Sequence, residues 1–250
     1  MTTRSPLRQA GSVTLWLVLA FLSLQFFFVG RIAVMAVLDP QSTSFQRSEA
    51  WRLATTGSLR WRQQWVPYHQ ISDSLKRAVI ASEDGDFTNH GGVEWGAIEQ
   101  AWQKNSRAEE QAARRAAQAR PGQTVRSAKL VGGSTITQQL AKNLLLSGER
   151  TLLRKGQELV LTLALEAFLP KSRILEIYLN SVEWGEGVFG AEAAARHYFR
   201  KSAAQLNHWE AARLAVMLPR PRFFEKTPNS PYLSSRAGTI VARMGDSQVP

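Results

Sequence analysis

The chain has 250 residues, of which 44% are hydrophobic and 20% charged, so it is long enough for one globular domain and is not disordered throughout. It contains no cysteine, which excludes disulfides, cysteine-ligated zinc, iron–sulfur clusters and thiol nucleophiles. Lys and Arg number 31 against 20 Asp and Glu, and the net charge of +11 indicates an anionic partner: nucleic acid, a membrane surface or a phosphorylated substrate.

An uncharged apolar run at residues 13–29, VTLWLVLAFLSLQFFFV, predicts a membrane anchor. Apolar residues continue to 38, and we assign 13–38 to a single transmembrane segment. A cleaved secretory signal is the alternative, but no convincing small-x-small cleavage site follows Val29. Arg4 and Arg8 precede the run without an acidic residue, so the positive-inside rule predicts a cytoplasmic N-terminus.

This topology places residues 1–12 in the cytoplasm and everything after the anchor in the periplasm, on the outer side of the cytoplasmic (inner) membrane. It excludes nucleic acid as a partner and favours membrane lipids or cell-wall material. Residues 39–70 then form a juxtamembrane connecting segment. Its interleaved Trp and Arg residues suit the headgroup zone, and an edge strand within 58–65 is an equally good interpretation.

Caps and apolar spacing predict a mainly α-helical outer domain. A helix begins at Ser72 or Asp73, a second is capped by Ser134 and runs to about Ser147, and an apolar helix over 154–169 is buried on all sides. Further helices are expected at 173–179, at 191–199 and from an Asn207–Glu210 capping box to about Leu218. Residues 104–129 lack large apolar groups and read as a mobile or loosely helical insertion, and 222–250 as a C-terminal tail.

Glu83 is the first candidate for chemistry. It lies four residues after Val79, which lies four after Leu75, so it shares their apolar helical face. Partial burial, with Asp84 and Asp86 close by, raises a carboxyl pKa and makes a general acid or base near neutrality. The alternative is an ordinary solvated acidic cluster at the end of a helix.

A second cluster, GGSTITQQLAKN, spans residues 132–143 and suits an anion. Its glycines and hydroxyl residues at a helix start leave backbone N–H groups free, and Gln138 and Lys142 follow on one helical face. The cations Arg150, Arg154 and Lys155 come next, and lysine and arginine near a helix start hold phosphate or pyrophosphate. The alternative is a capped surface helix with a solvated basic end.

Glu158 is a second unusual carboxylate, because it enters an otherwise apolar helix and therefore calls for a cationic partner or a function. The chain has no P-loop, HExxH or GxSxG motif. Its four histidines show no metal-ligand spacing, so no protein-bound metal site is predicted.

Five motifs in order resemble those of the peptidoglycan glycosyltransferases. They are AVIASEDGDFTNHGG, GGSTITQQLAKN, RKGQELVLTLALE, ILEIYLNSVEWGEGVFGAEAAARHYF and RLAVMLPRP, covering residues 71–221. One anchor and one domain, with no S-x-x-K nucleophile of a transpeptidase, resemble the monofunctional biosynthetic transglycosylases. The connection between Asn105 and Gly132 is longer than usual in the family, and Glu94-Trp95 replaces a pair that more often begins with Asp.

The resemblance implies a lysozyme-like, mainly α domain behind a single transmembrane helix. Such a domain polymerises lipid II into β-1,4 glycan strands by inverting transfer, with release of undecaprenyl pyrophosphate and without transpeptidase activity. The catalytic residues carried over are Glu83, as base, and Glu158. The substrate-binding residues carried over are Asp84, Phe87, Ser134, Thr135, Gln138, Gln139, Lys142, Arg150 and Lys155.

The expected partners are lipid II, the nascent glycan strand and membrane lipids, together with proteins of cell division or elongation. A divalent cation, Mg²⁺, bridging the pyrophosphate is the one cofactor that this chemistry admits. Two other readings stay open. One is a lytic muramidase, which also uses two carboxylates, and the other is a non-enzymatic scaffold of cell-wall synthesis.

Overall fold

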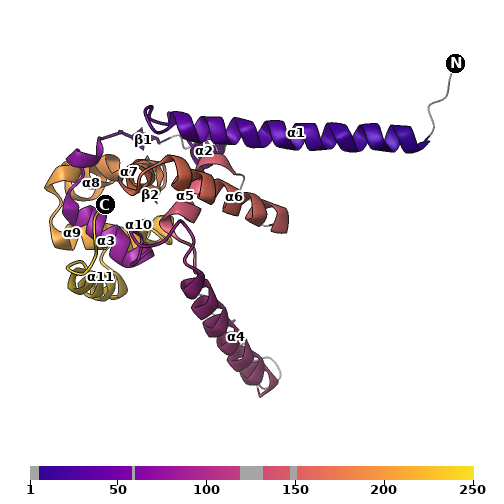
Figure 1. The fold of residues 1–250 in the computed structure, drawn as a ribbon. Coiled ribbons are helices and arrows are strands. Elements are labelled where there is room, and N and C mark those ends of the chain that lie inside the picture. The colour runs from indigo at the N-terminus through magenta and orange to yellow at the C-terminus, as the bar shows by residue number, and fades with distance from the viewer. Residues whose placement is uncertain (1–5, 58–59, 119–131, 147–150) are drawn as a thin grey trace.

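The computed structural model describes residues 6–57, 60–118, 132–146 and 151–250, and it is predominantly helical, as predicted. Two helices project from a helical body, the N-terminal α1 and the long α4 (Figure 1). The helices are α1 (Pro6–Val34), α2 (Ser44–Thr55), α3 (Asp73–Glu83), α4 (Trp95–Ala117), α5 (Ile136–Leu145), α6 (Leu152–Phe168), α7 (Lys171–Ser181), α8 (Ala191–Phe199), α9 (His208–Met217), α10 (Pro221–Lys226) and α11 (Pro231–Arg243). The short elements are β1 (Arg62–Gln63), β2 (Glu183–Gly185), β3 (Val188–Phe189) and 3₁₀ turns at Tyr68–Gln70 and Ala203–Gln205.

Helix α1 contains a 23-residue apolar stretch, Ser12–Val34, that is long enough to cross a membrane and is consistent with the predicted anchor. Its side packs along α6, where Gln25 and Gln157 exchange two amide hydrogen bonds of 3.1 and 2.8 Å. The chain that follows α1 is held by Arg173 of α7, which donates to the carbonyls of Met35 and Leu38. Helix α1 is therefore docked on the domain along its C-terminal half.

The segment 39–70 is more than a connection. It contains α2, which begins with a Thr43–Gln46 capping box and packs on α5, and the two-residue strand β1. Strand β1 pairs in parallel with β3, and β3 pairs antiparallel with β2. The edge-strand interpretation of 58–65 thus holds for residues 62–63, while 58–59 lie outside the described residues. Trp61 stacks on Phe189 at 4.5 Å, which ties this segment to the sheet.

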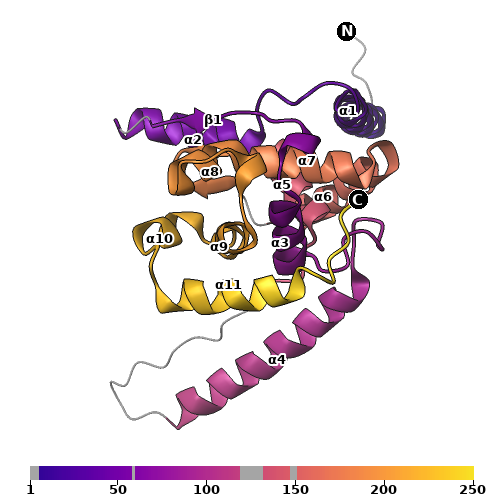
Figure 2. The same ribbon diagram turned by 90° about the vertical axis from the view of Figure 1, so that its left-hand side faces the viewer.

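The core forms where α3 packs on α9 and α11 and where α5 packs on α6 and α7, and Figure 2 shows α11 lying across α3 and α9. Ser72 caps α3 and the Asn207–Glu210 capping box starts α9, both as predicted. Residues 222–250 differ from the expected tail, because Leu233, Ala237 and Ile240 of α11 are buried. Their spacing of three and four residues is an amphipathic signal that makes α11 part of the domain.

Two predicted helices differ from the structure. The helix after the second cluster is capped by Thr135, not Ser134, and ends at Leu145. Helix α6 is buried on one face only, since Leu153, Val160 and Leu163 are exposed. Apolar residues on every side of α6 indicated burial on every side, but composition does not distinguish an exposed apolar face from a buried one.

The predicted insertion 104–129 is helical as far as Ala117, because the 23-residue helix α4 begins at Trp95 and continues into it. Ala101, near the start of α4, is the one residue of this helix that is buried. The series of Ala, Gln, Glu and Arg that suggested a loose segment also has high intrinsic helix propensity, which explains a regular helix without a packed face. The predicted insertion beyond residue 118 lies outside the described residues.

Candidate active site

Glu83 is the last residue of α3, and its side chain meets α5 and α7. Its Oε2 accepts a hydrogen bond of 3.0 Å from Nε2 of Gln139, and the Tyr178 hydroxyl donates to Oε1 of Gln139 at 2.9 Å. Burial of Tyr178 raises its pKa well above the ordinary value, so it stays a proton donor and orients the Gln139 amide toward Glu83. The Glu83 carboxylate is therefore held in place by Gln139, which is in turn held by Tyr178.

The pKa of Glu83 is raised above the ordinary glutamate value. Burial is the largest cause and the charge of Asp84 adds to it, while hydrogen bonds from Gln139 and Ser82 act in the opposite direction. The predicted combination of an apolar face and a neighbouring carboxylate is thus present. A half-buried carboxylate with a raised pKa is a suitable proton acceptor near neutral pH.

Asp84 is buried and joins the first motif to the second. One of its oxygens bonds Nε2 of His90 at 2.8 Å, and the other accepts the main-chain N–H of Ile136 at 2.9 Å. The N–H of Gly92 donates to Nδ1 of His90, which assigns the ring proton to Nε2 and directs it at Asp84. Phe87 is fully buried under the ammonium of Lys171. Asp84 and Phe87 are therefore both buried close to Glu83 in the sequence.

The second motif forms the start of α5. Thr135 caps the helix, makes a capping box with Gln138 and donates its hydroxyl to the Gly92 carbonyl at 2.6 Å. Thr135 and Gln138 are buried, whereas Ser134 is exposed. Of the substrate-binding residues predicted at the start of α5, Thr135 and Gln138 therefore form the helix cap and Ser134 presents an exposed hydroxyl. Gln139 is hydrogen-bonded to Glu83.

Glu158, buried in α6, carries the cationic partners that its position called for. Arg154 donates to it at 2.9 Å and Lys155 forms an ion pair with its other oxygen. The Lys155 side chain remains about half exposed. Nε of Arg154 is buried without a hydrogen-bond partner in the described part of the chain. Arg150, the third predicted cation, lies outside the described residues.

A groove of about 770 Å³ runs between α2, α5 and α6. It is lined by charged residues Arg47, Glu49, Lys142, Arg154 and Glu183, and by Ser44, Phe45, Ser48, Asn143, Leu145, Leu146, Val182, Leu218 and Pro221. Helix α5 connects this groove to the candidate base, because Gln139 bonds Glu83 and Lys142, three residues later, lines the groove. Helix α5 thus contributes both the hydrogen-bond partner of the candidate base and one cation of the groove.

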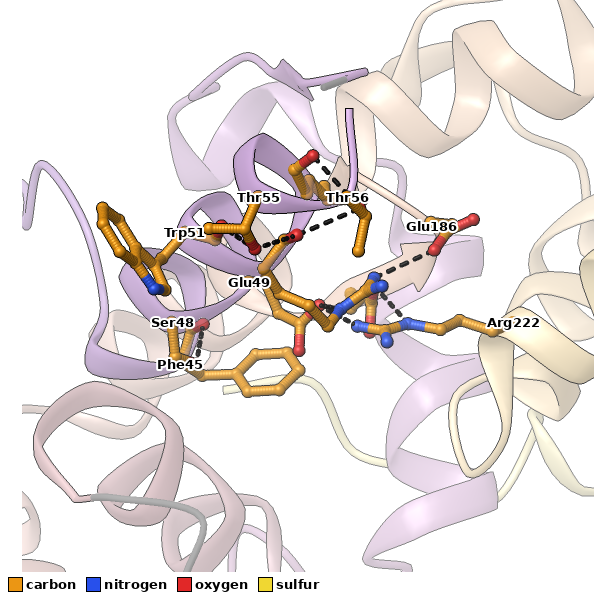
Figure 3. Close-up of polar contacts among 11 residues, drawn as sticks. Phe45, Ser48, Glu49, Trp51, Thr55, Thr56, Glu186 and Arg222 are labelled. Atoms are coloured by element: carbon orange, nitrogen blue, oxygen red, sulfur yellow. Dashed lines mark hydrogen bonds and ion pairs between the residues drawn. The ribbon is translucent and has the colours of Figure 1, made fainter. Parts of the chain in front are cut away.

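An ion-pair network that sequence reasoning missed closes one side of the groove (Figure 3). Arg222, just inside α10, donates to Glu183 at 2.9 and 3.1 Å and pairs with Glu49 of α2 at 2.5 Å. Arg52 links Glu49 to Glu186. Burial raises the pKa of Glu183, and Arg222 partly offsets the rise. The available signal was a carboxylate between Val182 and Trp184, two apolar residues in the fourth motif.

Two clusters of acidic side chains are candidates for a metal site. Ligand atoms of Asp84, His90 and Glu94 lie within 4.8 Å of one another, but the oxygens of Asp84 are bonded to His90 and Ile136. The groove carboxylates Glu49 and Glu183 are paired with Arg222. Neither cluster fits an Mg²⁺ ion without breaking these bonds.

Comparison with known proteins shows the family of the chain. The family model described as Transglycosylase matches residues 52–245, which extends the predicted domain of 71–221 at both ends and includes α11. The biosynthetic peptidoglycan transglycosylase of Burkholderia thailandensis is 51% identical over 232 residues, 92% of this chain and 84% of that protein. Those of Paraburkholderia xenovorans and Bordetella pertussis are 50% and 51% identical, over 93% and 90% of this chain and 90% and 88% of theirs. The chain belongs to the transglycosylase family of peptidoglycan glycosyltransferases, as the five motifs predicted.

Proposed function

We propose that this glycosyltransferase polymerises lipid II into β-1,4 glycan strands at the outer face of the cytoplasmic membrane. The observation that carries the proposal is the raised pKa of Glu83, whose carboxylate bonds Gln139 of α5, the helix whose Lys142 lines the cationic groove. A base for the acceptor and a cradle for a charged leaving group are the two parts that this transfer requires.

Glu83 takes the proton from the 4-hydroxyl of the acceptor GlcNAc as that oxygen attacks C1 of the donor MurNAc. Gln139 and Tyr178 hold the Glu83 carboxylate in position for this step. Asp84 fixes the start of α5 through its bond to the Ile136 N–H. A single displacement at an α-linked donor gives a β linkage, so the transfer inverts the configuration and needs no covalent enzyme intermediate.

The leaving group is undecaprenyl pyrophosphate, and the protein assists by neutralising the charge that develops on it. Lys142 and Arg154 line the groove and supply positive charge there. Lys155 and Arg150 are the further cations proposed for this role. Glu158 acts on them indirectly, by fixing Arg154 and Lys155.

The proposed topology is a single pass with a cytoplasmic N-terminus and a periplasmic catalytic domain. It is supported by Arg4 and Arg8 before the apolar stretch and by the exposed apolar face of α6 beside α1. This arrangement brings the groove to the membrane that carries a lipid-linked donor. Proteins of cell division or elongation are the further partners proposed for this position.

The test uses detergent-solubilised full chain, lipid II and detection of muramidase-sensitive polymer. Glu83→Gln is expected to lower the rate by ~10²–10⁴ without changing lipid II binding, because it removes only the general base. The matched control is Asp86→Asn, an exposed carboxylate of the same motif. More than a tenth of wild-type activity in Glu83→Gln, with the control unchanged, would exclude Glu83 as the base.

Lys142→Ala tests the cradle. It is expected to raise the donor KM and to make the rate more sensitive to salt, since a charge-assisted contact is lost. Lys104→Ala, an exposed lysine on α4, is the control for net charge. Unchanged kinetics in Lys142→Ala would show that Lys142 does not bind the leaving group.

The alternative functions predict other outcomes. Cleavage of finished peptidoglycan instead of polymer formation would identify a muramidase, and an inactive protein that still fulfils its cellular role would identify a scaffold.

A further inference from the structure

Arg31 and Arg47 share a single hydrogen-bond acceptor at the end of the anchor. Nη2 of Arg31 lies 3.3 Å from the Ser42 carbonyl oxygen and Nη1 of Arg47 lies 3.2 Å from the same atom. Arg47 also bonds the hydroxyls of Ser42 and Ser44. All these partners are neutral, so two positive charges are held together, and within the described ranges none of these hydrogen bonds is accepted by a carboxylate.

The carboxylates that could balance this pair are bonded elsewhere. Asp39, which lines the same hollow as Arg31, pairs with Arg173 at 2.7 Å. Glu49, two residues after Arg47 on α2, pairs with Arg52 and Arg222. Within the described residues, neither Arg31 nor Arg47 has a carboxylate at ion-pair distance. Two guanidiniums fixed in this way favour an anion between them.

The position of Arg31 indicates where that anion comes from. Arg31 lies three residues before the end of the apolar stretch, in a hollow of about 310 Å³ whose walls include Val34, Met35 and Leu38. A long cationic side chain at the end of a transmembrane helix reaches the phosphate level of the membrane while its stem stays among apolar groups. A guanidinium beside apolar walls suits a lipid that carries a phosphate, because the guanidinium can bind the phosphate and the walls can contact the apolar part of the lipid.

Arg47 continues the positive charge away from the membrane. It lines the 770 Å³ groove together with Lys142 and Arg154, the cations proposed for the leaving group. Arg31 and Arg47 thus form a bridge from the end of the anchor to that groove. A lipid-linked phosphate that moves from the membrane into the groove would meet this pair first.

We propose that Arg31 and Arg47 form a binding site for the phosphate of a membrane lipid, outside the catalytic contacts. If the phosphate belongs to the pyrophosphate of the incoming donor, this inference rests on the proposed function. An anionic phospholipid headgroup that seats the domain on the membrane has the same chemistry. The two sources are separated below by the lipid that each variant fails to bind.

The experiment compares Arg31→Gln, Arg47→Gln and Arg236→Gln in the full chain. Arg236 is exposed on α11 and controls for the loss of one positive charge. Binding of undecaprenyl pyrophosphate and of phosphatidylglycerol is titrated in detergent, where no turnover is needed. Initial rates are then measured in vesicles of phosphatidylcholine alone and of phosphatidylcholine with phosphatidylglycerol in equal parts, and melting temperatures confirm folding.

Each site variant is expected to bind its lipid about fivefold more weakly, the equivalent of about 1 kcal/mol per basic residue at a membrane surface. Weaker binding of undecaprenyl pyrophosphate, with a higher donor KM and unchanged kcat in both vesicles, assigns the site to the donor. Weaker binding of phosphatidylglycerol, with loss of any rate difference between the vesicles, assigns it to the headgroup.

Binding of both lipids at wild-type strength in Arg31→Gln and Arg47→Gln, as in Arg236→Gln, would overturn the proposal. If one variant fails to fold, the other carries the test, because both side chains contact the same carbonyl. An inactive wild-type chain would contradict the proposed function alone, since the binding titrations do not depend on activity.

Discussion

The carboxylate of Asp84 accepts the main-chain N–H of Ile136 at 2.9 Å, and this bond fixes the start of α5 against the end of α3. Glu83 directly precedes Asp84, and Gln139 follows Ile136 by three residues. The bond therefore sets the distance at which the proposed base meets its hydrogen-bond partner. It also satisfies one of the free N–H groups at a helix start, next to the positive end of the helix dipole.

Asp84→Ala is expected to lower the free energy of unfolding by about 3 kcal/mol, because it leaves the buried Ile136 N–H and the His90 ring without their acceptor. Urea denaturation measures this change. Asp84→Asn keeps one acceptor oxygen and should lose less stability, while its rate falls because Glu83 is no longer held against Gln139. A loss no larger than that of the exposed Asp86→Asn would mean that Asp84 does not join the two motifs.

The raised pKa of Glu83 predicts a pH dependence in both rate and stability. Because the fold disfavours the ionised form, wild type loses stability as pH rises from the ordinary value of 4.5 to the raised native pKa. Glu83→Gln should therefore melt higher than wild type at neutral pH and equally at low pH. The acid limb of the rate profile should lie above 4.5, and a limb at or below that value would contradict the assignment.

Replacement of residues 106–128 by a short Gly/Ser linker should leave the melting temperature unchanged. In the described part of this segment no residue is buried, and the contact of α4 with the domain is near its start, where Gly133 approaches Ala97 and Ala101. Equal polymerisation would make the segment passive. Lower activity in anionic vesicles alone would make it a membrane or substrate contact, and a fall in melting temperature would show that it packs on the domain.

The Gln25–Gln157 pair should stabilise the docking of α1 on α6. Interhelical hydrogen bonds within a membrane average ~0.6 kcal/mol and reach ~1.7 kcal/mol, so a double-mutant cycle should give a coupling of about 1 kcal/mol. Gln25→Leu leaves Gln157 without its partner, and the double Leu variant should recover part of the loss. Ser23→Leu, on the exposed side of α1, is the control, and additive effects would show that the amides are not coupled.

The sequence by itself determined what depends on residues a few positions apart. Helix caps act over three residues, which is why Ser72 and the Asn207–Glu210 pair marked the starts of α3 and α9. The alignment of Glu83 with Leu75 and Val79 likewise follows from the helical repeat and predicted its raised pKa. The five motifs identified the family for the same reason, since each is a continuous stretch of chain.

Only the tertiary structure decided which distant residues meet. Arg222 joins Glu49 to Glu183, Arg31 and Arg47 converge on Ser42, and Asp84 accepts from Ile136, yet no local pattern pairs these positions. The composition of α6 could not distinguish its buried face from its exposed face, because both are apolar. Side-chain partners far apart in the chain depend on how whole helices pack, and that packing sums many weak contacts that no short stretch of sequence contains.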